Sequence, residues 1–389
     1  MEADPIKEDT TQSPANDYSV GVDLGGTQIK AGLVLDNGDI IADLTIPSQA
    51  NDGAEVVARN IAKAIHSLLD EIQATDRNLN SRSSQSSPLT RRQEHVLGHL
   101  VGIGIGTPGL IIPSQGVVHF SPNFEGWCDI PLVNLVQQQL KPGIADLPIH
   151  IENDGNAMAY GELRQGAGIG LSDVVCLTLG TGVGGGIIID GQIFHGSRYV
   201  GAELGHTIIF GDGRRCSCSN YGCLEAYVGG GQIVERTRAK IIKEVRRSPG
   251  LESQLRALTP QTIAEAAVDG DPIAIEIFAE TARYIGIALT SFAHILNPQM
   301  VIIGGGVAAA GEKLLFEPIR VEVQQRAMDT NAESLQIVAA KLGNRAGFVG
   351  AAMLAGFFLS LFGGDLIWSL LFAVGGAVFI TANVRRGRV

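Results

Sequence analysis

Two stretches of the chain repeat the same order of elements. Residues 18–47 contain three short apolar β-runs, at 19–24, 29–35 and 40–46, separated by "GGT" and by an Asn-Gly turn. Residues 173–196, "DVVCLTLGTGVGGGIIIDGQIFHG", again follow the order strand, glycine turn, strand, Asp-Gly turn, strand. This repetition predicts an internal duplication, in which two related α/β lobes each present one glycine turn to a shared cleft.

The length and charge of the chain limit its class. Its 389 residues are enough for two domains with sizeable cores, and the formal net charge is −11. A nucleic-acid partner is not expected, because no basic face can dominate such a surface. The first residues, "MEADPIKEDTTQSPANDYS", have no apolar core and therefore do not form a signal peptide. We expect a cytoplasmic protein, in which structural disulfides are disfavoured.

The composition changes along the chain predict four parts. An apolar helical pattern at 53–74 is followed by a Ser/Arg-rich polar stretch, which we expect to be a surface loop. The expected parts are a disordered N-terminus (1–17), a smaller N-terminal lobe (18–150, with the polar loop at 75–94), a larger lobe (151–356) and a hydrophobic tail (357–389).

Glycine is unusually abundant, at 50 of the 389 residues, where ordinary usage is about 7%. Without a repeat period, this excess predicts tight turns and loops that cradle a ligand. Neither turn fits a Walker or Rossmann motif, because a β-run follows "DLGGT" where those motifs need a helix. Two such turns and a third glycine cluster still favour a nucleotide site. The residues expected at the phosphates are Gly25, Gly26, Thr27, Gly180, Thr181 and Gly182, with Gly305 and Gly306 beside the adenosine.

A carboxylate cluster lies between a short strand and a helix. In "IHIENDGNAMAYGEL", Glu152, Asn153 and Asp154 follow the strand directly. A carboxylate at a strand end that faces a cleft suits the base that phosphoryl transfer needs for the attacking hydroxyl. The alternative is that these residues only cap the helix, because Asn and Asp are both favoured at the N-cap position. The local sequence leaves both interpretations open.

Three of the five cysteines lie within "CSCSNYGCLE", in a C-x-C-x4-C spacing. A disulfide across one intervening residue is strained, and the C-x-x-C redox pair is absent. Zinc takes four nitrogen or sulfur ligands, and a histidine lies ten residues upstream. A Cys3His zinc site is therefore predicted, with incidental buried thiols as the alternative. Its ligands would be His206, Cys216, Cys218 and Cys223, whereas Cys128 and Cys176 are expected to be ordinary core residues.

Six motifs occur in the order found in one family: "DLGGTQIKAG", "GIGTPG", "ENDGNA", "LGTGVGGG", "GAELGH" and "CSCSNYGCLE". Over about residues 18–356 the chain resembles ROK-family sugar kinases, and bacterial ATP-dependent glucokinases best among them. The resemblance implies the actin-like/hexokinase two-lobed fold and an ATP–Mg²⁺ cofactor. It also implies phosphoryl transfer to a sugar hydroxyl and a homodimer.

The resemblance also implies roles for individual residues. Asp154 would be the general base for the 6-hydroxyl of glucose, and Asp23 would orient magnesium through water. A structural zinc would hold the sugar-binding loop. The residues that would bind the sugar are Asn123, Asn153, Asp154, Glu203, His206 and Glu225. Two positions depart from the family pattern: Ser219 replaces a glycine that follows the second cysteine, and Arg345 replaces a common acidic residue.

Other functions remain open at this point. The sugar could be N-acetylmannosamine, N-acetylglucosamine or fructose, because the motifs bind hydroxyls that these sugars share. A catalytically inactive sugar sensor is a further alternative. ROK-type repressors carry an N-terminal helix-turn-helix of about 60–80 residues, whereas only a short polar stretch precedes the first strand here, so a repressor is not expected.

The tail has its own pattern. Residues 366–384 are uncharged, and their number is close to the ~20 that span a bilayer. Trp368 lies near one end, and Arg385, Arg386 and Arg388 follow the other. We expect this segment to tether a cytoplasmic kinase domain to the membrane, with a buried core helix as the alternative. A single span would place the arginines on the non-cytoplasmic side, against the tendency of basic residues to stay in the cytoplasm. A hairpin with 348–362 as its first limb would return them to the cytoplasmic side.

Overall fold

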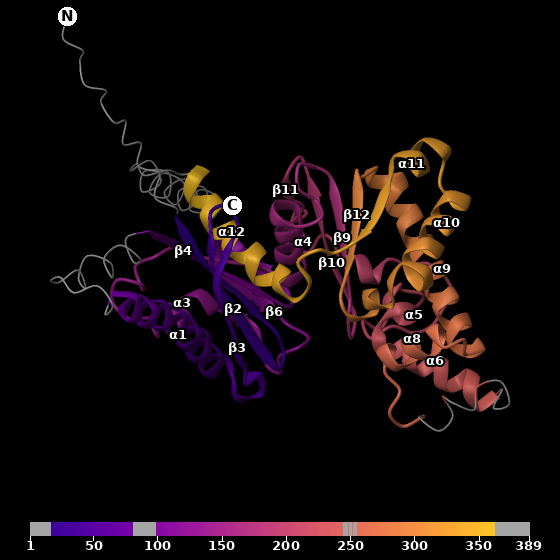
Figure 1. Ribbon diagram of the computed structural model, residues 1–389, viewed down its shortest axis with the longest axis horizontal. Helices are drawn as coiled ribbons and strands as arrows, with labels where there is room; N and C mark the ends of the chain where they lie inside the picture. Colours follow the sequence, from indigo (N-terminus) through magenta and orange to yellow (C-terminus); the bar gives the residue numbers. More distant parts are fainter. Residues whose placement is uncertain (1–16, 81–98, 244–247, 249–250, 252–254, 362–389) are drawn as a thin grey trace, which may run out of the picture.

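Two five-stranded sheets with the same topology form the framework of the protein (Figure 1). The computed structural model describes residues 17–80, 99–243, 248, 251 and 255–361. In the first sheet, the order β3-β2-β1-β4-β8 joins two antiparallel hairpins to two parallel strands. Its strands are β1 (Tyr18–Leu24), β2 (Gln28–Leu35), β3 (Ile40–Pro47), β4 (Leu100–Thr107) and β8 (Ile149–Asn153).

The second sheet repeats this pattern in the order β11-β10-β9-β12-β13. Its hairpins β9–β10 and β10–β11 are antiparallel, and β12 pairs in parallel with both β9 and β13. The duplicated α/β lobes predicted from the sequence are therefore confirmed, and the first three strands match their predicted ranges to within one residue. The strands are β9 (Val174–Leu179), β10 (Val183–Ile189), β11 (Gln192–Ile193), β12 (Met300–Gly304) and β13 (Gln336–Ala339).

Helices cover the outer face of each sheet (Figure 1). The first lobe carries α1 (Ala54–Asn80) and α3 (Leu132–Gln137), together with a small sheet of β5 (Leu110–Ile112), β6 (Val117–Phe120) and β7 (Cys128–Ile130). The second lobe carries α5 (Glu225–Val228), α6 (Gly230–Lys243), α8 (Pro260–Val268), α9 (Pro272–Leu296), α10 (Glu317–Arg326) and α11 (Asp329–Ser334). Short 3-10 or π turns are η1 (Ala50–Asp52), η2 (Pro113–Gln115), η3 (Leu204–His206), η5 (Gly306–Ala310), η6 (Glu312–Phe316) and η7 (Gly343–Arg345).

Two further helices, α4 (Asp154–Gln165) and α12 (Ala346–Leu361), lie between the sheets. Helix α12 packs on β1, β4 and α4, and α4 packs in turn on β9 and β10. Each lobe has its own apolar core under its outer helices, and a third core cluster contains residues of both sheets and both inner helices. The inner helices therefore join the two lobes.

Glycines allow α12 to approach the first sheet. A Cβ on Gly21 would lie 1.8 Å from the carbonyl oxygen of Phe348, and one on Gly104 would lie 1.8 Å from that of Ala351. On α12 itself, a Cβ on Gly350 would lie 1.7 Å from the carbonyl oxygen of Ala157 in α4. The expectation that the glycine excess serves turns and ligand loops is therefore incomplete, because these glycines serve backbone packing.

Two expected boundaries differ from the structure. Helix α1 continues to Asn80, six residues past its expected end and into the expected polar loop, because residues 75–80 include no glycine or proline to stop it. Residues 81–94 of that loop lie outside the described part. Strand β8 runs to Asn153, across the expected boundary at 150, and α12 returns to the first sheet. The first lobe therefore includes α12 as well as the N-terminal part of the chain.

Residues 1–16 of the predicted disordered N-terminus (1–17) lie outside the described residues, and so does the predicted membrane segment at 366–384. Between Asp17 and Leu361, no described helix combines the length and the apolar character that a bilayer crossing requires. Attachment of the tail to a membrane stays a prediction from the sequence.

The packing of α12 predicts that Gly104→Ala destabilises the protein. The new methyl group would collide with the backbone of α12, and overpacking of this kind costs about 1–3 kcal/mol or more. Gly231→Ala is the matched control, since nothing lies within 4 Å of its Cβ position in α6 and alanine favours helix. Urea unfolding should show a loss of stability for Gly104→Ala and none for Gly231→Ala. Equal stabilities would contradict the close contact.

Candidate active site

Asp154 lies where β8 ends and α4 begins. Asn153 is the N-cap of α4: its side-chain oxygen accepts hydrogen bonds from the backbone N–H groups of Gly155 (2.9 Å) and Asn156 (3.2 Å). Its amide nitrogen donates to the carbonyl oxygen of Gly109 (3.1 Å). The two sequence interpretations are therefore compatible, because Asn153 caps the helix and Asp154 is left as the first helical residue.

The electrostatic surroundings of Asp154 favour its protonated form. Burial, then the nearby charge of Asp23 and, more weakly, that of Glu203 raise the pKa of Asp154 to about 6, although a backbone hydrogen bond from Gly155 opposes the shift. These couplings bring together three residues that the sequence analysis had assigned to one site. A carboxylate with a pKa near 6 is ionised at neutral pH and still binds a proton more tightly than an ordinary aspartate.

A buried ion pair adjoins Asp154. The carboxylate of Glu152 is 2% exposed, and its Oε2 atom lies 2.7 Å from Nε2 of His195. Burial raises the pKa of Glu152, but the nearby His150 and the hydrogen bonds from His195 and Asn156 outweigh this effect and lower the pKa to about 2. Burial likewise lowers the pKa of His195, but its bond to Glu152 raises it above the ordinary value. The contact therefore favours the ionised form of both groups.

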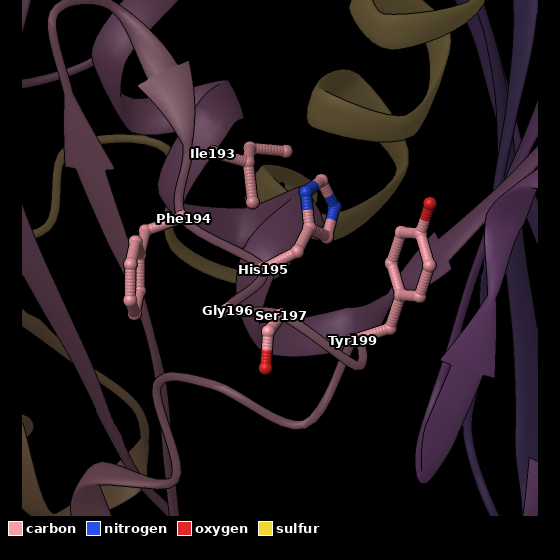
Figure 2. Close-up of a pocket in the computed structure, with 6 residues that line it drawn as sticks. All are labelled: Ile193, Phe194, His195, Gly196, Ser197 and Tyr199. Carbon is pink, nitrogen blue, oxygen red and sulfur yellow. The ribbon is translucent and has the colours of Figure 1, made fainter.

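His195 also lines an open depression of about 510 Å³ (Figure 2). The depression lies in the segment that follows β11 and is lined by Ile193, Phe194, His195, Gly196, Ser197 and Tyr199. Neither His195 nor a role for Glu152 was predicted from the sequence. The sequence signal that could have indicated a role for Glu152 is its position directly before Asn153, the N-cap of α4.

Asp23 lies at the end of β1 beside the start of α12. A Cβ on Gly347 would lie 2.7 Å from its carboxyl carbon, and Nζ of Lys30 is 4.0 Å from Oδ2. Burial raises the pKa of Asp23, and the charge of Lys30 partly opposes this rise. The strand ends of the first sheet thus supply two of the carboxylates of the site, Asp23 at the end of β1 and Asp154 directly after β8.

The two glycine turns are surface hairpins. In the first, Gly26 and Thr27 are exposed, and Ser48 ties the turn to the end of β3 by donating to the carbonyl oxygens of Gly26 (3.0 Å) and Thr27 (3.0 Å). In the second, between β9 and β10, Gly180 and Thr181 are exposed. Both turns therefore present backbone to solvent.

The third glycine cluster lies beside the second turn. Gly305 has a φ of 89°, and a Cβ there would lie 2.4 Å from the carbonyl oxygen of Leu179; Gly306 begins η5. The carbonyl oxygen of Gly180 accepts from the N–H of Gly230 at the start of α6 (2.9 Å). The predicted nucleotide residues of the second lobe are thus neighbours at the carboxyl ends of β9 and β12.

Glu225 contacts this turn. Its Oε2 accepts from the backbone N–H of Val183 (2.9 Å), and its Oε1 accepts from the hydroxyl of Ser217 (2.7 Å). Glu225 therefore connects the second glycine turn to the cysteine segment. Asn123 lies in the exposed loop between β6 and β7. Contact of either residue with a sugar stays a prediction.

The predicted metal ligands converge. One ligand atom from each of His206, Cys216, Cys218 and Cys223 lies within 4.8 Å of the others. Nδ1 of His206 is 3.6 Å from Sγ of Cys216, and the sulfurs of Cys218 and Cys223 are 3.7 Å apart. A disulfide needs about 2.0 Å. Tetrahedral zinc separates two sulfurs by about 3.8 Å and a sulfur and a nitrogen by about 3.6 Å, so these residues fit the ion.

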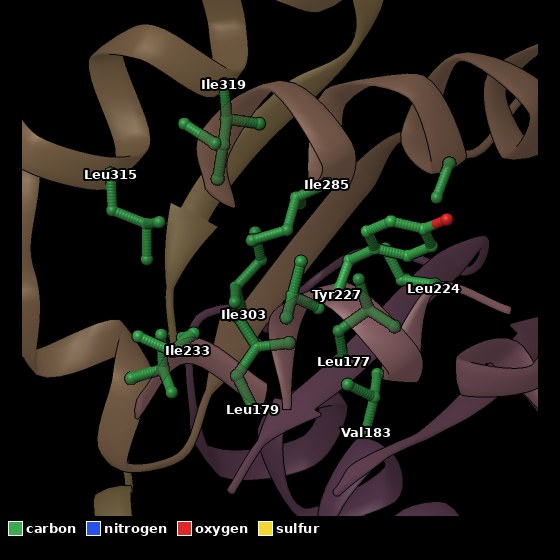
Figure 3. Packing of buried hydrophobic residues seen from close by; sticks show 14 of the residues in the cluster. Leu177, Leu179, Val183, Leu224, Tyr227, Ile233, Ile285, Ile303, Leu315 and Ile319 are labelled. Carbon is green, nitrogen blue, oxygen red and sulfur yellow. The ribbon is translucent and has the colours of Figure 1, made fainter. Parts of the chain in front are cut away.

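The cysteine segment is anchored in the core of the second lobe. Leu224 and Tyr227 follow the third cysteine and belong to the same buried cluster as Leu177 and Val183 (Figure 3). Burial of Cys223 with its neighbouring thiols raises its pKa to about 12. Without a bound cation, Cys223 is therefore a neutral thiol at neutral pH.

The structure also gives the positions of the two residues that depart from the family pattern and of the two remaining cysteines. Ser219 has a φ of 73°, so its position is left-handed, as the glycine pattern suggested. Arg345 lies 3.7 Å from Asp43 on β3. Cys176 is buried as expected, but Cys128 is exposed and its expected core position is wrong, because β7 belongs to the small surface sheet.

Comparison with known proteins assigns the family. The model of the ROK family matches residues 87–356, which is more than half of the chain. The chain belongs to the ROK family. The fold agrees with a ROK glucokinase from Streptomyces griseus, solved in complex with glucose and AMPPNP, at a TM-score of 0.68 and 33% identity over 87% of this chain and 99% of that one.

The relatives of this ROK protein include both enzymes and regulators. It is 34% identical to a glucokinase of Halalkalibacterium halodurans over 87% of its own length and 94% of that protein. It is 32% identical to a xylose repressor of Caldicellulosiruptor bescii over 85% of its own length and 76% of that protein. The similarities support a sugar kinase, and the identity of the sugar has to be inferred from the site.

The raised pKa of Asp154 predicts a pH-dependent cost to stability. A carboxyl group whose pKa is raised in the folded state costs stability as the pH rises above its unfolded-state pKa, and the full cost is reached above the folded-state pKa. Asp154→Asn should therefore raise the Tm by roughly 2–5 °C at pH 7.5, and this gain should vanish near pH 4. Asp329→Asn, at an exposed position, is the control. A mutant that is less stable than wild type at pH 7.5 would contradict the assignment.

Proposed function

We propose that this ROK protein is an ATP-dependent hexose kinase that phosphorylates the 6-hydroxyl of glucose, with Asp154 as general base. The observation that carries the proposal is the position of Asp154. It lies at the carboxyl end of β8, with a pKa raised to about 6 and within electrostatic reach of Asp23 and Glu203. The 33–34% identity to glucokinases supports glucose as the sugar.

In the proposed reaction, ionised Asp154 accepts the proton of the 6-hydroxyl as that oxygen attacks the γ-phosphorus of ATP. The bond from the γ-phosphorus to the bridging oxygen breaks, and ADP leaves. The N-cap bonds of Asn153 fix the first turn of α4 and with it the position of Asp154. Orientation of this kind accounts for much of the rate of phosphoryl transfer.

The two glycine turns are the proposed phosphate-binding elements. The exposed backbone of Gly26, Thr27, Gly180 and Thr181 can approach phosphate oxygens closely, because glycine has no side chain to block the approach. Magnesium, when bound with ATP, supplies positive charge to the β- and γ-phosphates. Asp23 is the carboxylate proposed to orient the ion through water.

The sugar is proposed to bind between the two lobes. Asn153 donates one amide hydrogen to Gly109, which leaves the second for a ring hydroxyl. Glu203 is exposed next to η3 and influences the pKa of Asp154, so its carboxylate can accept from the sugar near the reacting group. The other proposed sugar ligands are Asn123, His206 and Glu225.

We also propose that His206, Cys216, Cys218 and Cys223 bind one structural zinc ion. The distances between their ligand atoms support this site. The ion would fix the segment that carries Glu225, which also contacts the second glycine turn. The boundary between the lobes, predicted at residue 150, is proposed to follow β8 at Asn153, because β8 belongs to the first sheet. A homodimer and membrane attachment through 366–384 remain predictions.

A sugar-responsive regulator is the second candidate, because xylose repressors are among the relatives. A regulator or an inactive sensor would bind sugar without releasing ADP. Kinases for N-acetylmannosamine, N-acetylglucosamine or fructose would release ADP with those sugars in preference to glucose. A coupled ADP-release assay over these sugars separates the alternatives.

The general-base assignment predicts that Asp154→Asn lowers kcat at least ~10³-fold, while glucose still binds. Loss of the base removes an interaction that matters mainly in the transition state, so the KM should change little. Steady-state kinetics and calorimetric titration with glucose measure both quantities, and Asp329→Asn serves as the charge-matched control. Activity within tenfold of wild type would remove Asp154 from this role.

The zinc site predicts one zinc per chain by elemental analysis. Cys216→Ser and Cys218→Ser should lose the metal, unfold at lower temperature and show a raised KM for glucose. Cys128→Ser changes an exposed thiol outside the cluster and should retain the metal. Metal-free protein with full activity and an unchanged Tm would defeat the proposal.

A further inference from the structure

The Glu152 carboxylate contacts both the first turn of α4 and a residue of the second lobe. Its Oε1 atom accepts hydrogen bonds from the backbone N–H of Asn153 (2.9 Å) and from the side-chain amide of Asn156 (3.0 Å). Its Oε2 atom faces Nε2 of His195 at 2.7 Å and, less closely, Nε2 of His150 at 3.9 Å. Glu152 therefore fixes the first turn of α4, on which Asp154 lies, and bonds at the same time to a residue that follows β11.

His195 in turn closes the segment that leads to Glu203. The carbonyl oxygen of His195 accepts from the N–H of Gly201 (2.9 Å), so residues 195–201 form a closed loop. The ring of His195 also packs edge-on against Tyr199, with 5.5 Å between the ring centroids (Figure 2). Two residues after Gly201, Glu203 is the N-cap of the η3 turn, and its carbonyl oxygen accepts from the N–H of His206 (3.0 Å).

The backbone of this loop is strained. Tyr199 has a φ of 60° and Ala202 a φ of 63°, both in the left-handed region that side chains disfavour. Such conformations persist only where the surrounding contacts determine them, and they gather at functional sites. The bond from His195 to Glu152 is the contact that ties the beginning of the loop to the first lobe.

We propose that Glu152 and His195 are a positioning pair that aligns Asp154 with the sugar-binding segment at Glu203 and His206. The pair rests on the proposed function, since it aligns the proposed base with the proposed sugar ligands. Neither residue touches the substrate in this proposal. Glu152 holds the first turn of α4, which carries Asp154, and His195 holds the loop that leads to the proposed sugar ligand Glu203. Loss of the contact between Glu152 and His195 should therefore affect both sugar binding and turnover.

Two substitutions of His195 test the proposal. His195→Phe keeps a ring of similar shape but removes the donor, and leaves the Glu152 charge buried without its partner. His195→Gln places an amide N–H near the position of Nε2 and should restore the bond. We expect His195→Phe to raise the KM for glucose and lower kcat, with a loss in kcat/KM of about 100-fold, because small displacements of reacting groups have effects of this size. His195→Gln should stay within about threefold of wild type.

Two further variants separate positioning from stability. Glu162→Gln changes another buried carboxylate of α4, which accepts backbone bonds from Ala167, Lys341 and Leu342. It should lower the Tm and leave the kinetic constants unchanged at temperatures where the protein is folded. The double variant Glu152→Gln/His195→Phe should be no worse than His195→Phe alone, because no unpaired charge remains.

Hydrogen exchange of the backbone gives a readout that does not require catalysis. His195→Phe should accelerate exchange both at 153–157 and at 196–206, whereas His195→Gln should not. A wild-type chain that transfers no phosphoryl group would defeat the proposed function, and the exchange pattern would still decide the pairing. The pairing is overturned if His195→Phe lowers the Tm without changing kcat/KM or exchange in these segments, or if both His195 variants behave alike.

Discussion

The close contact of α12 with the glycines of the first sheet is the constraint on which the arrangement of the site depends. Gly21 and Gly104 bring the backbone of α12 onto β1 and β4, and Gly350 brings α12 onto α4. Because α4 packs on the second sheet, these contacts set the spacing between the lobes. They also bring the start of α12 to Asp23 and leave the start of α4, with Asp154, in the same region. Larger residues at the glycines would move the two carboxylates apart.

The pKa values of two carboxyl groups that are separated by one residue, Glu152 and Asp154, are shifted in opposite directions by their surroundings. Glu152 accepts hydrogen bonds from donors that include His195, which holds its pKa near 2, so that it is an anion with a structural task. Asp154 is half-buried, and its desolvation together with the nearby charges of Asp23 and Glu203 raises its pKa to about 6. Groups whose environments separate their pKa values in this way take different roles in acid–base catalysis. Here Glu152, which stays an anion, positions the first turn of α4, and Asp154, which binds a proton more readily, is the proposed base.

The elements and the chemistry of the site could be predicted from the sequence to different extents. The alternation of apolar runs and glycine turns predicted the duplicated sheets, and the spacing of Cys216, Cys218 and Cys223 after His206 predicted their convergence. Contacts between residues distant in sequence could not be predicted. The pairing of Glu152 with His195 depends on the packing of two lobes, and the packing role of Gly104 depends on a helix almost 250 residues further along the chain. The exposure of Cys128 likewise depends on a small sheet that its local pattern does not indicate.

The central claim is that the carboxylates between the lobes direct the γ-phosphoryl group of ATP to the 6-hydroxyl of glucose. The most direct measurement compares ADP release and the phosphorylated product with glucose and with 6-deoxyglucose, at saturating Mg-ATP. The account predicts rapid ADP release and glucose 6-phosphate as the product with glucose. With 6-deoxyglucose, which lacks the acceptor, it predicts release no faster than without sugar. Equal ADP release with both sugars, or a product phosphorylated at another hydroxyl, would contradict the account.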